Sequence, residues 1–190
     1  LTVTGVQTCA LPIWPAGLAC ADQLNQVGHS VTVYEKSDRV GGLLMYGIPG
    51  FKLDKQVVKR RIKLMIDEGV VFLPGIHVGV DLPLKKLMGD FDAVVLCGGS
   101  EKPRDLSVEG RDLDGVHYAM DFLPQQNKRN EGDVISNDIS IVAKDKNVLI
   151  IGGGDTGSDC LGTSLRQGAK NVYQFELLPQ PTDKRKPTNP

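Results

Sequence analysis

Residues 147–176 read NVLIIGGGDTGSDCLGTSLRQGAKNVYQFE, and this stretch indicates the fold most clearly. Its β-branched run, Val148–Ile151, is typical of a buried parallel strand. Gly152, Gly154 and Gly157 follow with the spacing G-x-G-x-x-G. In this pattern the first glycine turns the chain, the second admits a pyrophosphate to the backbone, and the third lets the helix pack on the strand. The stretch therefore predicts a dinucleotide-binding strand–turn–helix unit.

The residues after the glycines extend this prediction. A helix is expected over 155–167, and it begins with Asp155 and Thr156, whose backbone amides would face a bound phosphate. Gly168 would end this helix. The strand NVYQFEL then carries Glu176 at its end, near the distance of about 20 residues expected for a carboxylate that binds a ribose. The alternative is a glycine-rich turn in an ordinary strand–helix–strand unit.

A second copy of this layout lies earlier, over PAGLACADQLNQVGHSVTVYEK, residues 15–36. Gly17 takes the place of the third glycine, and Gly28 would end the helix. The strand SVTVYEK carries Glu35 at the position that Glu176 has in the later unit. We therefore expect Glu35 to accept hydrogen bonds from a ribose.

Positions 12 and 14 should hold the first two glycines of this earlier unit, but they are Pro12 and Trp14. Proline has no amide donor, and a tryptophan side chain would fill the space of the pyrophosphate. Every residue from Val3 to Ile13 matches the translation of a common sequencing-adapter oligonucleotide, and the adapter's next base joined to GG encodes Trp14. We therefore expect residues 1–14 to be a non-native scar. The first strand of the unit would then be missing.

Composition excludes several classes of protein. The chain has 190 residues, a formal net charge of −1 and a hydrophobic fraction of 41%, which is typical of a soluble globular protein and argues against a nucleic-acid partner. No apolar run reaches the roughly 18 residues of a membrane helix, so we expect no membrane contact. The four cysteines form no C-x-x-C motif, and the histidines are scattered. We therefore expect no metal site, and thiols typical of a cytoplasmic protein.

Four motifs occur in order along the chain: PAGLACA, GGLLMYGIP, FKLDK and GGGDTGSDC. Over residues 15–190 the sequence resembles the small (β) subunit of glutamate synthase, in the superfamily of FAD- and NAD(P)H-dependent pyridine nucleotide-disulfide oxidoreductases. Dihydropyrimidine dehydrogenase and ferredoxin-linked NADPH oxidoreductases share part of this set. The stretch QFELLPQP favours glutamate synthase.

The resemblance implies an α/β fold with two Rossmann-like domains, both incomplete here. Residues 15–112 would form an FAD domain without its first strand, and residues 113–190 a truncated NAD(P) domain inserted into it. In this family NAD(P)H gives a hydride to FAD, and electrons pass through iron–sulfur clusters to a large subunit that makes glutamate from glutamine and 2-oxoglutarate. The clusters would lie in a missing N-terminal part or in the partner. We expect this fragment alone to be inactive and to bind FAD weakly.

The resemblance also assigns site residues, and none of them is catalytic, because hydride transfer between two cofactors needs no protein acid or base. Leu43, Leu44 and the stretch Tyr46–Pro49 would lie near the flavin ring. The residues expected to approach the FAD phosphates, ribose or ribitol are Gly17, Glu35, Arg39, Gly41, Gly42, Gly98 and Gly99.

Two questions stay open at this stage. Glu176 would repel the 2′-phosphate of NADPH and so favours NADH, but Lys184, Arg185 and Lys186 could fold back onto that phosphate. The rival functions are a disulfide reductase, a non-catalytic nucleotide sensor and a docking subunit. The first needs a C-x-x-C near the nucleotide domain, and no cysteine lies between Cys97 and Cys160.

Overall fold

A computed structural model describes residues 7–11 and 15–179 of the chain. Its contacts divide the chain into two compact units, Leu1–Ser136 and Asn137–Pro190. This boundary falls later than residue 113, where the sequence predicts the second domain to begin. The reason is that helix α4, Ala119–Asn130, packs on the first unit, where its Asn127 is buried.

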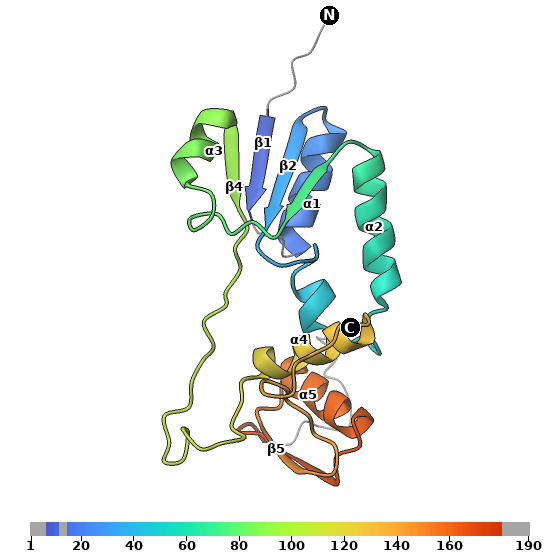
Figure 1. Cartoon of the computed structure of the whole chain (residues 1–190), viewed down its shortest axis with the longest axis vertical. Coiled ribbons are helices and arrows are strands. Elements are labelled where there is room, and N and C mark those ends of the chain that lie inside the picture. The colour runs from blue at the N-terminus through green and yellow to red at the C-terminus, as the bar shows by residue number, and fades with distance from the viewer. Residues whose placement is uncertain (1–6, 12–14, 180–190) are drawn as a thin grey trace, which may run out of the picture. The chain divides into compact units, whose positions relative to one another are not determined.

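The first unit is a parallel sheet with helices (Figure 1). The strand order is β3-β2-β1-β4, and every neighbouring pair is parallel. Besides α4, its elements are β1 (Gln7–Leu11), α1 (Pro15–Gln26), β2 (Ser30–Glu35), a π-helix η1 (Leu43–Gly47), α2 (Lys55–Asp67), β3 (Val71–Pro74), α3 (Leu84–Asp90) and β4 (Ala93–Leu96).

Strand β1 corrects the expectation that the first strand is missing. It lies between β2 and β4, with Gln7 opposite Ser30 and Leu11 opposite Leu96. A parallel ladder is built from backbone groups, so a short segment free of glycine and proline can take the central place whatever its origin. The segment QTCAL meets that condition. The neighbouring strands therefore have a partner for their backbone groups.

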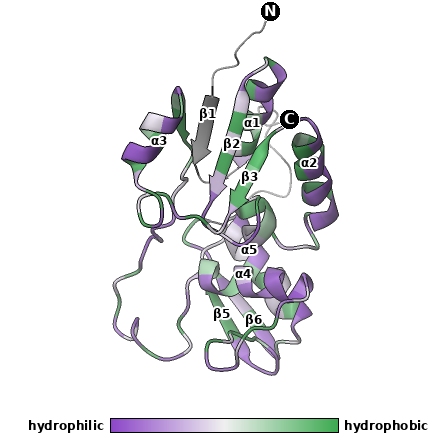
Figure 2. Cartoon of the chain, turned by 45° about the horizontal axis from the view of Figure 1, so that its top comes forward, coloured by the Kyte–Doolittle hydropathy of each residue, from purple (hydrophilic) through white to green (hydrophobic). Residues whose placement is uncertain are grey.

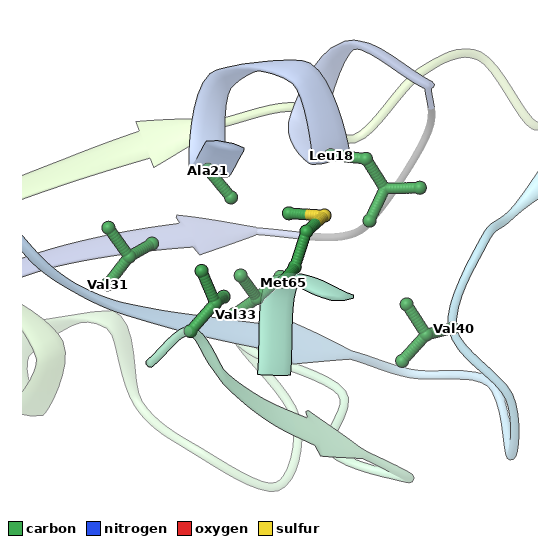
Figure 3. Close-up of a cluster of buried hydrophobic side chains, with 7 residues drawn as sticks. Leu18, Ala21, Val31, Val33, Val40 and Met65 are labelled. Atoms are coloured by element: carbon green, nitrogen blue, oxygen red, sulfur yellow. The ribbon is translucent and has the colours of Figure 1, made fainter. Parts of the chain in front are cut away.

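The main core of this unit lies between β2 and the helices α1 and α2. Alternate residues of β2, Val31 and Val33, point to one face and are 2% and 0% exposed. Ala21 of α1 and Met65 of α2 pack against them (Figure 3). In Figure 2, which is coloured by hydropathy, hydrophobic residues lie along β2 and β3, and many residues of α2 are hydrophilic. This packing fixes the carboxyl ends of the strands.

The second unit contains β5 (Asn147–Ile151), α5 (Asp155–Arg166) and β6 (Asn171–Phe175). The two strands are parallel, with Asn147 opposite Asn171 and Ile151 opposite Phe175. These bounds confirm the predicted strand–helix–strand order, and the helix ends one residue earlier than expected. Among the described residues, no helix is long and apolar enough to cross a membrane.

Candidate dinucleotide-binding sites

The glycine turn of the second unit is fixed to the neighbouring strand. The Gly152 amide donates to the Phe175 carbonyl at 2.8 Å, and the Gln174 side chain donates to the Gly152 carbonyl at 2.8 Å. Gly152 has a φ of +117°, which favours glycine. A Cβ on Gly154 would meet no atom within 4 Å, whereas one on Gly157 would lie well under 3.0 Å from the Gly152 carbonyl oxygen. The turn is therefore open at Gly154 and closely packed at Gly157.

Glu176 stands directly after β6, as the sequence predicts, and its carboxylate lies over Gly153 of the turn. Its Oε1 accepts a hydrogen bond from the Leu178 amide at 3.0 Å. This bond, with further ones from the Leu177 and Gly153 amides, lowers the pKa of the Glu176 carboxyl. The Glu176 carboxyl group is therefore ionised at neutral pH. Lys184, Arg185 and Lys186 lie outside the described residues.

Asp155 and Thr156 open helix α5, and Gly154 precedes them as the N-cap. The first amides of a helix have no partner inside the helix, and its dipole favours an anion at this end. An open turn followed by free helix amides is the arrangement that binds phosphate groups in other proteins.

In the first unit, Glu35 ends β2 and is only 3% exposed. Its Oε1 accepts from the Ser37 amide at 2.8 Å. Gly17 is buried in the first turn of α1. Pro12 and Trp14, which the sequence places in the phosphate turn, lie outside the described residues.

A pocket of about 350 Å³ lies at the carboxyl ends of the strands. This is the edge at which open parallel sheets bind ligands. A Cβ on Gly98 would meet no atom within 4 Å, and Gly99 has a φ of +63°. Lys36 donates to Glu101 across 2.5 Å and so joins the ends of β2 and β4. The lining residues are Tyr34, Lys36, Ile76, His77, Val78, Leu96, Gly98 and Glu101.

Sequence reasoning missed one wall of this pocket, Ile76–Val78. These residues follow β3 and belong to no motif, so only the pairing of β3 with β2 brings them to the site.

Arg39, which the resemblance assigns to the FAD phosphates, is engaged with protein groups in the structure. Its guanidinium donates to both carboxylate oxygens of Asp133, at 2.6 and 2.7 Å, and to the Tyr46 hydroxyl at 2.9 Å. The bond to Asp133 raises the pKa of Arg39, and the same bond lowers that of Asp133. Sequence reasoning could not name Asp133, because its partner lies 94 positions earlier.

Gly41 and Gly42 lead into the π-helix η1 with φ values of +125° and +51°, which favour glycine. A Cβ on Gly41 would lie 3.3 Å from the Met45 and Val58 side chains. Within η1, Met45, Tyr46 and Gly47 are buried, whereas Leu43 and Leu44 are partly exposed. The segment predicted to lie near the flavin ring is therefore packed into the first unit through Met45, Tyr46 and Gly47.

The structure thus brings the predicted residues into three groups. Glu35, Gly98 and Gly99 lie at the carboxyl edge of the first sheet, and Arg39, Gly41 and Gly42 lie at η1. Gly152, Gly154–Gly157 and Glu176 lie at the turn of the second unit, and Gly17 stands apart from these groups in the first turn of α1. Within residues 7–11 and 15–179, no cluster of three histidine, cysteine or acidic side chains could hold a metal ion.

A strand, a glycine turn, a helix and a carboxylate at the next strand end occur together in dinucleotide-binding α/β proteins. The family model for pyridine nucleotide-disulphide oxidoreductases matches residues 15–188, and the chain belongs to this family.

The relatives narrow the comparison further. The chain is 52% identical to the glutamate synthase [NADPH] small chain of Mycobacterium tuberculosis, over 99% of this chain and 39% of the relative. It is 53% identical to the corresponding small chain of Bacillus subtilis, over 93% of this chain and 36% of the relative. Glutamate synthase [NADH] of Schizosaccharomyces pombe is 52% identical over 98% of this chain and 9% of the relative. The chain thus spans about two fifths of the bacterial relatives.

Solved structures agree with the fold. Mycobacterium tuberculosis FprA in complex with NADPH superposes with a TM-score of 0.72 at 20% identity, covering 90% of this chain and 43% of FprA. A 2-naphthoyl-CoA reductase gives a TM-score of 0.68 at 26% identity, covering 90% of this chain and 23% of that one.

Proposed function

We propose that the chain is part of the electron-input subunit of a glutamate synthase, a cytoplasmic flavoprotein that takes electrons from NAD(P)H. The observation that carries this proposal is the 52% identity to a glutamate synthase small chain over 99% of the chain. In the complete protein, electrons would pass through iron–sulfur clusters to a large subunit that makes glutamate from glutamine and 2-oxoglutarate.

The proposal assigns one dinucleotide to each unit, in two Rossmann-like domains. FAD would bind the first unit, with Glu35 on its ribose. NAD(P)H would bind the second unit, with its pyrophosphate at Gly152–Thr156 and its ribose at Glu176. The open space at Gly98 and Gly154 supports this assignment, because a backbone free of Cβ atoms admits a ligand closely.

Bound flavin would supply the redox chemistry, namely acceptance of a hydride and release of single electrons. The residues of this chain would bind and orient the cofactors. Gly17 in α1, and Gly41 and Gly42 beside η1, would leave room for the FAD phosphates and ribitol. Gly99, which follows β4, would lie in the turn that closes over the FAD.

Arg39 contributes indirectly in this proposal. Its guanidinium is held by Asp133, so it would steady the loop before Gly41 and Gly42 and add positive charge near the phosphates. A direct bond to a phosphate would require the ion pair with Asp133 to open.

The nucleotide preference rests on Glu176. Its ionised carboxylate would repel the 2′-phosphate of NADPH, which favours NADH. The names of the relatives include both NADPH and NADH, so the assay should compare the two.

Isothermal titration of the purified chain with NADH and NADPH tests the assignment of the second unit. We expect Glu176→Gln to weaken NADH binding about 10-fold, because one charge-assisted hydrogen bond is lost. The difference in affinity between NADH and NADPH should become smaller, because the charge that repels the 2′-phosphate is removed. Glu35→Gln is the matched control, since it changes the other unit. The proposal would be contradicted if both variants lost NADH affinity equally, or if neither variant lost any.

A further inference from the structure

Two buried polar side chains converge on the backbone of η1. The Lys55 ammonium of α2 donates to the carbonyls of Leu44 and Ile48, at 2.8 and 2.5 Å. The Asn127 amide of α4 donates to the carbonyls of Tyr46 and Ile48, at 2.8 and 3.2 Å. Lys55 is 5% exposed and Asn127 is 2% exposed.

The Tyr46 side chain is held as well. Its hydroxyl donates to Asp38 at 2.7 Å and accepts from Arg39 at 2.9 Å. The Lys128 ammonium lies 5.2 Å from the centre of its ring. Burial raises the pKa of the Tyr46 hydroxyl, which therefore stays protonated and able to donate. Segment 43–48 is thus held through both its backbone and its most polar side chain.

The burial of Lys55 carries a free-energy cost that its hydrogen bonds must offset. Burial of an ammonium group is unfavourable without hydrogen bonds, and here those bonds go to backbone carbonyls of a single short segment. A π-helix is a rare conformation that occurs frequently at functional sites. Lys55 and Asn127 come from helices far apart in the sequence, and both reach the Ile48 carbonyl.

We propose that Lys55 and Asn127 are positioning residues that fix segment 43–48 in its ligand-facing conformation before any ligand binds. This inference rests on the proposed function, in which the segment lies beside the flavin ring. A segment ordered in advance loses less conformational entropy when the ligand binds, so the bound state forms more tightly. The two side chains would therefore act on FAD affinity without touching FAD.

Hydrogen exchange of the unliganded chain is the first measurement. The amides of Tyr46 and Ile48 donate to the carbonyls of Gly42 and Leu43 at 2.9 and 2.8 Å, so they report the order of η1. In Lys55→Met and Asn127→Leu we expect their exchange to rise about 10-fold or more, while the amides of β2 are unchanged. Lys59→Met is the matched control, because Lys59 lies one turn further along α2 and pairs with Glu131.

The second measurement is FAD affinity by quenching of flavin fluorescence. We expect both variants to bind FAD about 10-fold more weakly than the parent chain, and Lys59→Met to bind like the parent. Lys55→Arg, which keeps a charged donor, should retain part of the protection and of the affinity. This rescue also separates positioning from a loss of folding in Lys55→Met.

Unchanged exchange at Tyr46 and Ile48 would overturn the inference, as would a uniform rise that includes β2. Faster local exchange with FAD affinity equal to that of the parent would also overturn it. If the parent chain shows no FAD binding at all, the affinities are compared in the chain with Pro12→Gly and Trp14→Gly, which restores the G-x-G-x-x-G spacing with Gly17. No FAD binding there would overturn the assignment of FAD to the first unit, and the role of Lys55 and Asn127 toward flavin with it.

Discussion

Gly154 and Gly157 stand three positions apart, yet the structure gives them opposite constraints. A Cβ at Gly154 meets open space, and the φ of −73° suits any residue. A Cβ at Gly157 would overlap the Gly152 carbonyl and the Gln174 side chain. The same residue type therefore leaves room for a ligand at one position and allows close packing at the other.

This contrast predicts different effects for two alanine variants. Gly157→Ala forces α5 away from the turn, and we expect it to destabilise the second unit by about 2–4 kcal/mol. Gly154→Ala should change stability by less than about 0.5 kcal/mol but weaken NADH binding, because its methyl group enters the space of the pyrophosphate. Denaturant unfolding and NADH titration check both variants. Equal stability of the two variants would refute the packing argument.

At this scale the sequence predicts the residues whose roles depend on local spacing. Glu35 and Glu176 stand at the ends of their strands, and Gly28 and Gly168 have the positive φ values of helix-ending glycines. The partner of Arg39 is a different case. Asp133 reaches it only through tertiary packing, and no local pattern marks such a pair.

At the scale of elements, the helices and strands with clear hydrophobic patterns are predictable, and the connecting segments are not. The motif GGLLMYGIP indicates a cofactor segment by resemblance, but nothing in its spacing predicts a π-helix. Its backbone carbonyls accept hydrogen bonds from Lys55 and Asn127, which belong to two other helices. The sequence of residues 7–11 does not predict β1 either, because its place in the sheet comes from backbone pairing with β2 and β4.

Positions 12 and 14, which precede α1 in the sequence, carry the next prediction. Pro12 and Trp14 stand where the G-x-G-x-x-G spacing that ends at Gly17 calls for glycine. Replacement by glycine at both, Pro12→Gly with Trp14→Gly, restores the G-x-G-x-x-G spacing with Gly17. We expect this double variant to bind FAD at least about 10-fold more tightly than the parent, because an amide donor and space for the pyrophosphate are gained.

Fluorescence titration with FAD measures the effect, and NADH titration is the control, because the second unit is unchanged. Equal FAD affinity of the double variant and the parent would show that positions 12 and 14 do not belong to a phosphate turn.

At the scale of the whole molecule, the two units differ in how well they are covered. In the first, Val31 and Val33 of β2 lie within a core closed by α1 and α2. In the second, Leu149 and Ile151 of β5 are 53% and 67% exposed, and Tyr173 and Phe175 of β6 are 56% and 61% exposed. Parallel sheets are normally covered on both faces, and a small unit with two strands buries little apolar surface.

We therefore expect the second unit to open more readily than the first. Native-state hydrogen exchange should show the amides of β5 and β6 exchanging at least about 10-fold faster than those of β2, because local opening needs less free energy where less apolar surface is buried. NADH at about 100 times its Kd should slow the exchange of β5 and β6, since a ligand that binds only the folded unit stabilises it by about 2.7 kcal/mol. It should leave β2 unchanged, because β2 belongs to the other unit. Equal protection of the strands in both units would contradict the argument from burial, and NADH-dependent protection of β2 would show that the two units open together.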